Sequence, residues 1–106
     1  MTDTTPNPVA GLREAATLMN ERADAMDAEM KRAPKFWDGG YGYNVNGALG
    51  GPAGEMAAPW DQVAVRAVAA LLDAEADRAE QSGVWLPDSA DSRVLAVARS
   101  YLGETR

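Results

Sequence analysis

The feature of the sequence that most constrains its fold is an alanine-rich stretch over residues 60–79, whose apolar residues recur at helical spacing. On a helical projection of about 3.6 residues per turn, one face gathers around Leu72. That face comprises Val65, Val68, Ala69, Leu72, Ala76 and Ala79. The opposite face is apolar too, with Val63, Ala67, Ala70 and Ala74. Since a helix that is apolar on two sides needs a neighbour on each, we expect a central helix over 59–82 packed between two others.

A stripe of carboxylates runs between these two apolar faces. Asp73, Asp77 and Glu80 follow one another at spacings of four and three residues, so their charges lie close together on the helix surface and repel one another. We therefore expect this flank of the central helix to remain in water.

The two expected neighbours are helices over 8–33 and 89–102. Asn7 and Pro8 form a start signal for the first, and Pro34 ends it. Its apolar stripe is Val9, Leu12, Ala16, Met19, Ala23, Met26, Met30 and Ala33. This stripe can pack on the central helix or pair with a second copy of the chain as a homodimer. The face of the last helix is Val94, Val97, Ala98 and Tyr101, and Gly103 stops it.

Residues 34–57 form an insert rich in glycine and aromatic residues. Asp38-Gly39 and Asn46-Gly47 are typical of type I′ turns, and Tyr41, Tyr43 and Val45 alternate between them with a period of two. This pattern predicts a short β-meander or hairpin within 35–49, with strands at 35–37, 40–45 and 48–49. The predicted architecture is a mainly α, three-helix domain over 8–106 with this insert, preceded by a disordered lead at 1–7.

Composition narrows the classes of function. The chain has no histidine and no cysteine, which removes the commonest general base, metal ligand and thiol nucleophile. The net charge of −6 disfavours direct binding to nucleic acid, because phosphate affinity comes from clustered Lys and Arg, which the ten basic residues do not form. No apolar run approaches the roughly 20 residues that cross a bilayer, and the start lacks a signal peptide. We expect a cytoplasmic, non-membrane protein that is not an enzyme and has no catalytic residue or cofactor.

The glycine-rich insert matches neither a phosphate-binding motif nor a calcium-binding loop. The segment GALGGPAGE before the central helix matches neither common phosphate-binding motif, and Glu55 and Asp61 stand where an anion would bind. If Gly47 took the sixth place of a calcium loop, its first and twelfth places would be Gly42 and Ala53, which carry no carboxylate. The insert therefore predicts no metal site.

The aromatic residues of the insert are the best candidates for a functional surface. Phe36, Trp37, Tyr41 and Tyr43 fall within eight positions. They either cover a thin sheet or form an exposed recognition surface, because aromatic side chains are enriched where proteins bind one another. Trp60 and Trp85 flank the central helix and are expected to seal the core.

Two segments of the chain carry a resemblance. The first is LREAATLMNERAD, and the second is the pair PWDQVAVRAVAALLDAEAD and RVLAVARSYLGE. They resemble segments of small uncharacterised proteins of actinobacteria, their phages and integrated elements. The resemblance implies provenance in a bacterial host cell and an order of helices, but no chemistry and no site residues. This sequence departs from the pattern of those proteins in its glycine-rich middle.

These observations favour a non-enzymatic accessory protein of an actinobacterial phage or mobile element that binds a protein partner. Phe36, Trp37, Tyr41 and Tyr43 are the predicted contact residues. The alternative is an acidic inhibitor that imitates DNA and occupies a nucleic-acid enzyme of the host through Asp73, Asp77 and Glu80.

Overall fold

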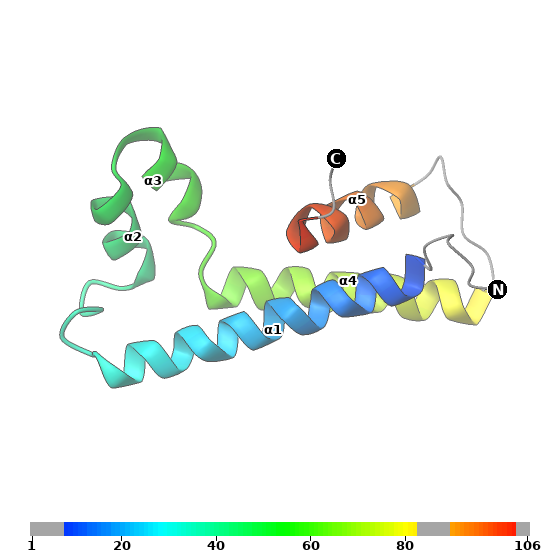
Figure 1. The fold of residues 1–106 in the computed structure, drawn as a ribbon, viewed down its shortest axis with the longest axis horizontal. Coiled ribbons are helices and arrows are strands. Elements are labelled where there is room, and N and C mark those ends of the chain that lie inside the picture. Colours follow the sequence, from blue (N-terminus) through cyan, green and yellow to red (C-terminus); the bar gives the residue numbers. More distant parts are fainter. Residues whose placement is uncertain (1–7, 83–89, 104–106) are drawn as a thin grey trace. The chain divides into compact units, whose positions relative to one another are not determined.

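The computed structural model describes residues 8–82 and 90–103, which form five helices and no β-strand (Figure 1). The helices are α1 (Pro8–Arg32), α2 (Tyr41–Leu49), α3 (Gly51–Ala57), α4 (Gln62–Ser82) and α5 (Ala90–Leu102). The expectation of a mainly helical chain is confirmed. The predicted lead at 1–7 and Trp85 lie outside the described residues.

The predicted three-helix domain with a β-meander is wrong. Helices α1, α4 and α5 fall close to the expected ranges 8–33, 59–82 and 89–102, but the segment predicted as strands forms α2 and the following residues form α3. Type I′ turns require a positive φ at both central residues. Within the described ranges positive φ occurs only at Gly40, Gly50, Gly51 and Gly103, so neither Asp38-Gly39 nor Asn46-Gly47 forms such a turn.

A helix over 41–49 has its own pattern in the sequence. Tyr41, Val45 and Leu49 recur every four residues, which is the spacing of one helix face, and this period competes with the alternation of Tyr41, Tyr43 and Val45. Glycines set the limits of the helix. Gly40 precedes α2 with φ of 91°, and Gly50 follows it with φ of 71°. These conformations favour glycine, and they separate α2 from its neighbours.

The described residues fall into two compact units, one made of 8–19 with 68–82 and 90–103, and the other of 20–67. The first unit has a core built mainly of alanine. Its buried side chains are Leu12, Ala15, Ala16 and Met19 of α1, Ala69, Leu72, Ala76 and Ala79 of α4, and Ala98 of α5. Helix α5 approaches α1 closely, because a Cβ on Gly11 would lie 3.7 Å from Cδ1 of Leu95.

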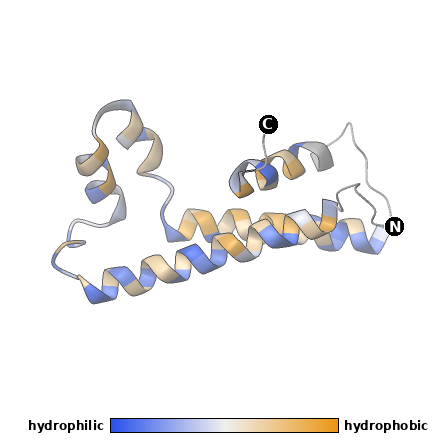
Figure 2. Cartoon of the chain, viewed as in Figure 1, coloured by the Kyte–Doolittle hydropathy of each residue, from blue (hydrophilic) through white to orange (hydrophobic). Residues whose placement is uncertain are grey.

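The core face predicted for the central helix is confirmed, but the neighbour predicted for its opposite face is not found. Val63 is 76% exposed, and Ala67, Ala70 and Ala74 are exposed as well. The hydropathy colouring of α4 in Figure 2 shows the apolar character of this helix. An exposed alanine costs little free energy, so apolar character alone did not specify burial.

The apolar stripe of α1 packs within the chain. Four of its eight members, Leu12, Ala16, Met19 and Ala23, are buried. The alternative of a homodimer through this stripe stays a prediction. Trp60 is 52% exposed and does not seal a core.

In the unit formed by 20–67, a polar cluster joins α1 to α4. One carboxylate oxygen of Asp27 accepts a hydrogen bond from Gln62 at 2.8 Å, and the other accepts one from Arg66 at 2.6 Å. Arg66 also pairs with Asp24 at 2.8 Å. The hydrogen bond from Gln62, followed by that from Arg66, lowers the pKa of the Asp27 carboxyl below its ordinary value.

Two adjacent leucines of α4 provide a matched test of the core. Leu72 is 1% exposed and Leu71 is 60% exposed. We expect Leu72→Ala to lower the free energy of unfolding by about 2–5 kcal/mol, because it leaves a cavity in the core. Leu71→Ala should stay within about 0.5 kcal/mol of the parent chain. Urea unfolding followed by circular dichroism measures both, and equal losses would contradict the assigned core face.

The Asp27 cluster predicts a dependence of stability on pH. Because the folded state lowers the pKa of Asp27, the stabilisation is complete above the unfolded-state pKa of about 3.9 and is lost as the pH falls through the lower folded-state value. Asp27→Asn should therefore reduce the melting temperature at neutral pH and leave a smaller further decrease on acidification. Glu14→Gln, which removes an exposed carboxylate of α1, is the control. If the melting temperatures of Asp27→Asn and the parent chain fell by the same amount from neutral to acidic pH, this role would be contradicted.

Candidate protein-binding surface

The turn between α1 and α2 brings three of the predicted aromatic residues into contact. The rings of Trp37 and Tyr41 are stacked, with centroids 6.3 Å apart and planes 6° apart. Phe36 meets Trp37 edge to face, with centroids 5.0 Å apart. Backbone hydrogen bonds from Trp37 to Ala33 and from Gly40 to Trp37 hold the turn. The aromatic cluster is therefore a defined local structure, and the predicted sheet that it was expected to cover does not exist.

The four aromatic side chains divide into two that are partly covered and two that face solvent. Trp37 and Tyr41 are half-buried, whereas Phe36 is 66% exposed and Tyr43 is 75% exposed. The expectation that these residues cover a thin sheet is wrong, because residues 35–49 form no strand, and the recognition surface stays a prediction. Phe36 and Tyr43 are the rings available to a partner.

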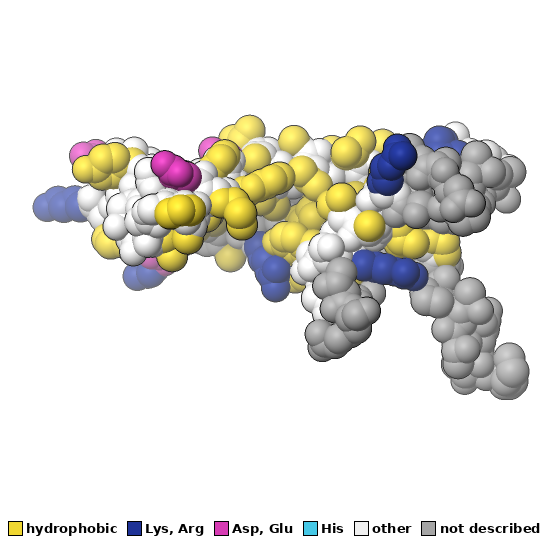
Figure 3. All heavy atoms as spheres, turned by 90° about the horizontal axis from the view of Figure 1, so that it is seen from above, with side chains coloured by type: hydrophobic (Ala, Val, Ile, Leu, Met, Phe, Trp, Pro, Cys, Tyr) yellow, Lys and Arg dark blue, Asp and Glu magenta, His cyan; other side chains and the backbone are white. Residues whose placement is uncertain are grey.

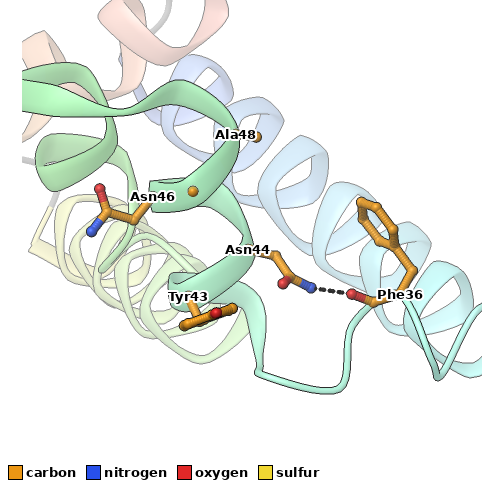
Figure 4. A pocket seen from close by; sticks show the side chains of 6 residues that line it. Phe36, Tyr43, Asn44, Asn46 and Ala48 are labelled. Atoms are coloured by element: carbon orange, nitrogen blue, oxygen red, sulfur yellow. Dashed lines mark hydrogen bonds between the residues drawn. The ribbon is translucent and has the colours of Figure 1, made fainter.

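Phe36 and Tyr43 border an open hollow of roughly 560 Å³ (Figure 4). Its lining is Phe36, Tyr43, Asn44, Asn46, Gly47 and Ala48. The side-chain amide of Asn44 donates a hydrogen bond to the backbone carbonyl of Phe36 at 2.5 Å, which ties α2 to the turn. The hollow has the size of a small-molecule pocket, but its two aromatic rings are exposed, so it suits a side chain projecting from a partner better than an enclosed ligand.

The floor of this surface is the hairpin of α2 and α3, which pack together through glycine. Gly54 is buried, and a Cβ there would lie 2.9 Å from the backbone oxygen of Asn46 and 3.0 Å from its Cα. Only glycine fits without moving backbone atoms. Pro52 stands in the first turn of α3, where its fixed φ suits a helix start.

The hairpin is almost free of charge. Residues 39–60 contain one charged side chain, Glu55, although the chain as a whole is 25% charged. Several large apolar side chains of this unit are exposed. They are Phe36, Tyr43, Leu49, Met56, Trp60 and Val63. Figure 3 shows hydrophobic side chains gathered on the surface of this part of the chain, a composition that marks protein interaction sites.

The predicted carboxylate stripe of the central helix is exposed, but it is not free. Arg13 of α1 lies on it and pairs with Asp77 at 2.9 Å, with Asp73 at 3.8 Å and with Glu80. The hydrogen bonds to Asp77 and then to Glu80 raise the pKa of the Arg13 guanidinium. Arg13 could not be identified from the sequence, because no spacing rule relates it to residues sixty or more positions away. The stripe therefore serves as an ion-pair contact between α1 and α4.

Trp37 also approaches the end of α1. Its indole nitrogen is buried and has no hydrogen-bond partner of ordinary geometry. The hydrogen bond from Arg32 is the main cause that lowers the pKa of the Glu29 carboxyl, and the indole N–H of Trp37 adds to the same effect. We place the indole near this carboxylate without a well-formed hydrogen bond. The backbone hydrogen bond from Trp37 to Ala33 is what connects the aromatic cluster to the end of α1.

The described residues contain no group of three or more acidic side chains arranged to hold a metal ion. None of the described helices is long and apolar enough to cross a membrane. Neither family models, nor curated proteins, nor solved structures give a match to this chain. The actinobacterial resemblance of the sequence consequently stays a prediction.

The contact at Gly54 gives a test of the hairpin. Gly54→Ala should destabilise it by about 1–3 kcal/mol, because the added methyl group meets the backbone of Asn46. Gly47→Ala is the matched control, since a Cβ there has no neighbour within 4 Å and alanine favours a helix by up to about 1 kcal/mol. Hydrogen exchange of the α2 and α3 amides measures both changes. Equal protection in the two variants would contradict the close packing of the hairpin.

Proposed function

We propose that this chain is a non-enzymatic accessory protein that acts by binding another protein through the surface around Phe36 and Tyr43. Under this proposal it works in the cytoplasm of a bacterial host, as part of an actinobacterial phage or mobile element. That provenance rests on the resemblance of its LREAA and LAVARSYLGE segments alone.

One observation carries the proposed binding role. The α2–α3 hairpin exposes Tyr43, Leu49 and Met56 while carrying a single charged residue. Exposed apolar area of this kind raises the free energy of the isolated chain in water, and covering it with a partner lowers that free energy. The aromatic rings at its border are side chains that commonly dominate binding energy.

The DNA-mimic alternative has less support. It requires a row of carboxylates that a nucleic-acid enzyme can bind in place of phosphates. Arg13 pairs with Asp73, Asp77 and Glu80, so an enzyme would have to compete with an internal cation for this row.

The proposal predicts the effect of removing the exposed rings. The double variant Phe36→Ala with Tyr43→Ala should reduce recovery of a protein partner from native-host lysate by at least about tenfold, a loss typical of hot-spot residues. The control is Leu71→Ala with Val97→Ala, which removes two exposed apolar side chains from α4 and α5. Quantitative mass spectrometry of the captured proteins measures the difference.

Folding is monitored separately by thermal melting of each variant. If the double variant melts below the parent, Tyr43→Ala alone is used, because Tyr43 is the more exposed ring. Equal recovery by the parent and a folded aromatic variant would show that this surface does not bind the partner.

A further inference from the structure

We infer that the hollow bordered by Phe36 and Tyr43 binds an acidic segment of the partner protein that carries one projecting apolar side chain. The inference rests on the proposed function and specifies the chemistry of the partner. It follows from three features of the same unit: the shape of the hollow, the exposed basic residues that precede Phe36 in the chain, and the lack of charge on the hairpin.

The apolar anchor follows from the lining of the hollow. Phe36 and Tyr43 stand at its border, and Gly47 and Ala48 contribute little side-chain bulk within it. A Cβ on Gly47 would meet nothing within 4 Å, so the surface is open at this point. A leucine or aromatic side chain placed there would contact rings on its sides and helix backbone beneath it, and such anchors in pockets dominate interface energies.

The acidic character of the partner follows from the cations that precede Phe36. Lys31, Arg32 and Lys35 fall within five positions, and no other stretch of the chain places three basic residues so closely. Lys31 and Lys35 are the only lysines in the sequence. All three side chains are exposed. Basic residues that precede one border of the hollow in the chain would attract an acidic segment and orient it, while the apolar contact would provide most of the affinity.

The three cations differ in their availability. Arg32 pairs with Glu29, and Lys31 lies near enough to Asp27 to lower its pKa, as a smaller contribution after Gln62 and Arg66. Lys35 makes no ion pair with any described residue. Lys35 is therefore the cation best placed to meet a carboxylate of the partner.

Charge complementarity also distinguishes this partner from a second copy of the chain. A two-fold symmetric contact brings the same patch of both copies together, so Lys35 and its neighbours would face identical cations. An anionic lipid surface fits less well, because it presents no projecting side chain that would fill the hollow bordered by Phe36 and Tyr43.

The test uses the full chain and a display library of short random peptides. Peptides are selected on the parent chain, and those that also bind the Phe36→Ala, Tyr43→Ala variant are discarded. We expect the remaining peptides to contain a leucine or aromatic residue flanked by Asp and Glu. Fluorescence anisotropy of these peptides should show binding that weakens about fivefold in the Lys31→Gln, Lys35→Gln variant and also weakens as salt is raised.

The control is Arg93→Gln with Arg99→Gln, which removes two positive charges from α5 and should leave peptide affinity within about twofold. Selected peptides that are neutral or basic, or that bind with no dependence on salt or on the lysines, would overturn the acidic-partner inference while leaving the proposed function intact. Peptides that all survive without Phe36 and Tyr43 would contradict the proposed function itself. A dimer of the parent chain in light scattering that the aromatic variant lacks would identify a second copy as the occupant instead.

Discussion

The packing of α1 against α4 is the interaction on which the rest of the structure depends, and it is made largely by alanine. In the unit that contains α5, the large side chains that are fully buried are Leu12 and Leu72. Each buried methyl or methylene group contributes only about 0.8 kcal/mol, so an alanine core stabilises the pair weakly. Small side chains do allow the helix backbones to approach closely, and this proximity lets Arg13 reach carboxylates on α4.

Ion pairs supply the specificity that alanine lacks. An alanine stripe has little shape to fix how one helix slides along another. Arg13 meets carboxylates of α4 in one unit, and Arg66 meets carboxylates of α1 in the other. Exposed ion pairs add little stability, but a rotation of either helix that turned its charged flank away from the other helix would separate these charges. We therefore assign these arginines to alignment of the helices more than to stability.

The sequence could predict the long helices but not the short ones. The stripe of α1 and the core face around Leu72 extend over many turns, so their period is unambiguous. Over 41–49 the chain is short enough for periods of two and four to coexist, since Tyr41 and Val45 belong to both. In the helical form Gly54 packs closely against Asn46, and a contact between separate segments leaves no mark in local periodicity. The prediction that the second apolar face of α4 is buried was wrong for another reason: hydrophobic character permits burial but does not require it.

The sequence predicted which aromatic residues belong to the candidate surface, but not which of them are exposed or which elements carry them. Four aromatic residues near a glycine-rich segment indicated recognition, whereas only the fold separates the exposed Phe36 and Tyr43 from the stacked Trp37 and Tyr41. The form matters because helices of nine and seven residues are too short to be stable alone in water. Gly54 is the only buried residue of these two helices, so the hairpin gains little from its own core. A partner that covers Tyr43 and fills the adjacent hollow would remove apolar area from water at the place where the hairpin has least internal support. Binding and hairpin stability are therefore coupled: whatever orders the hairpin prepares the surface, and whatever binds the surface orders the hairpin.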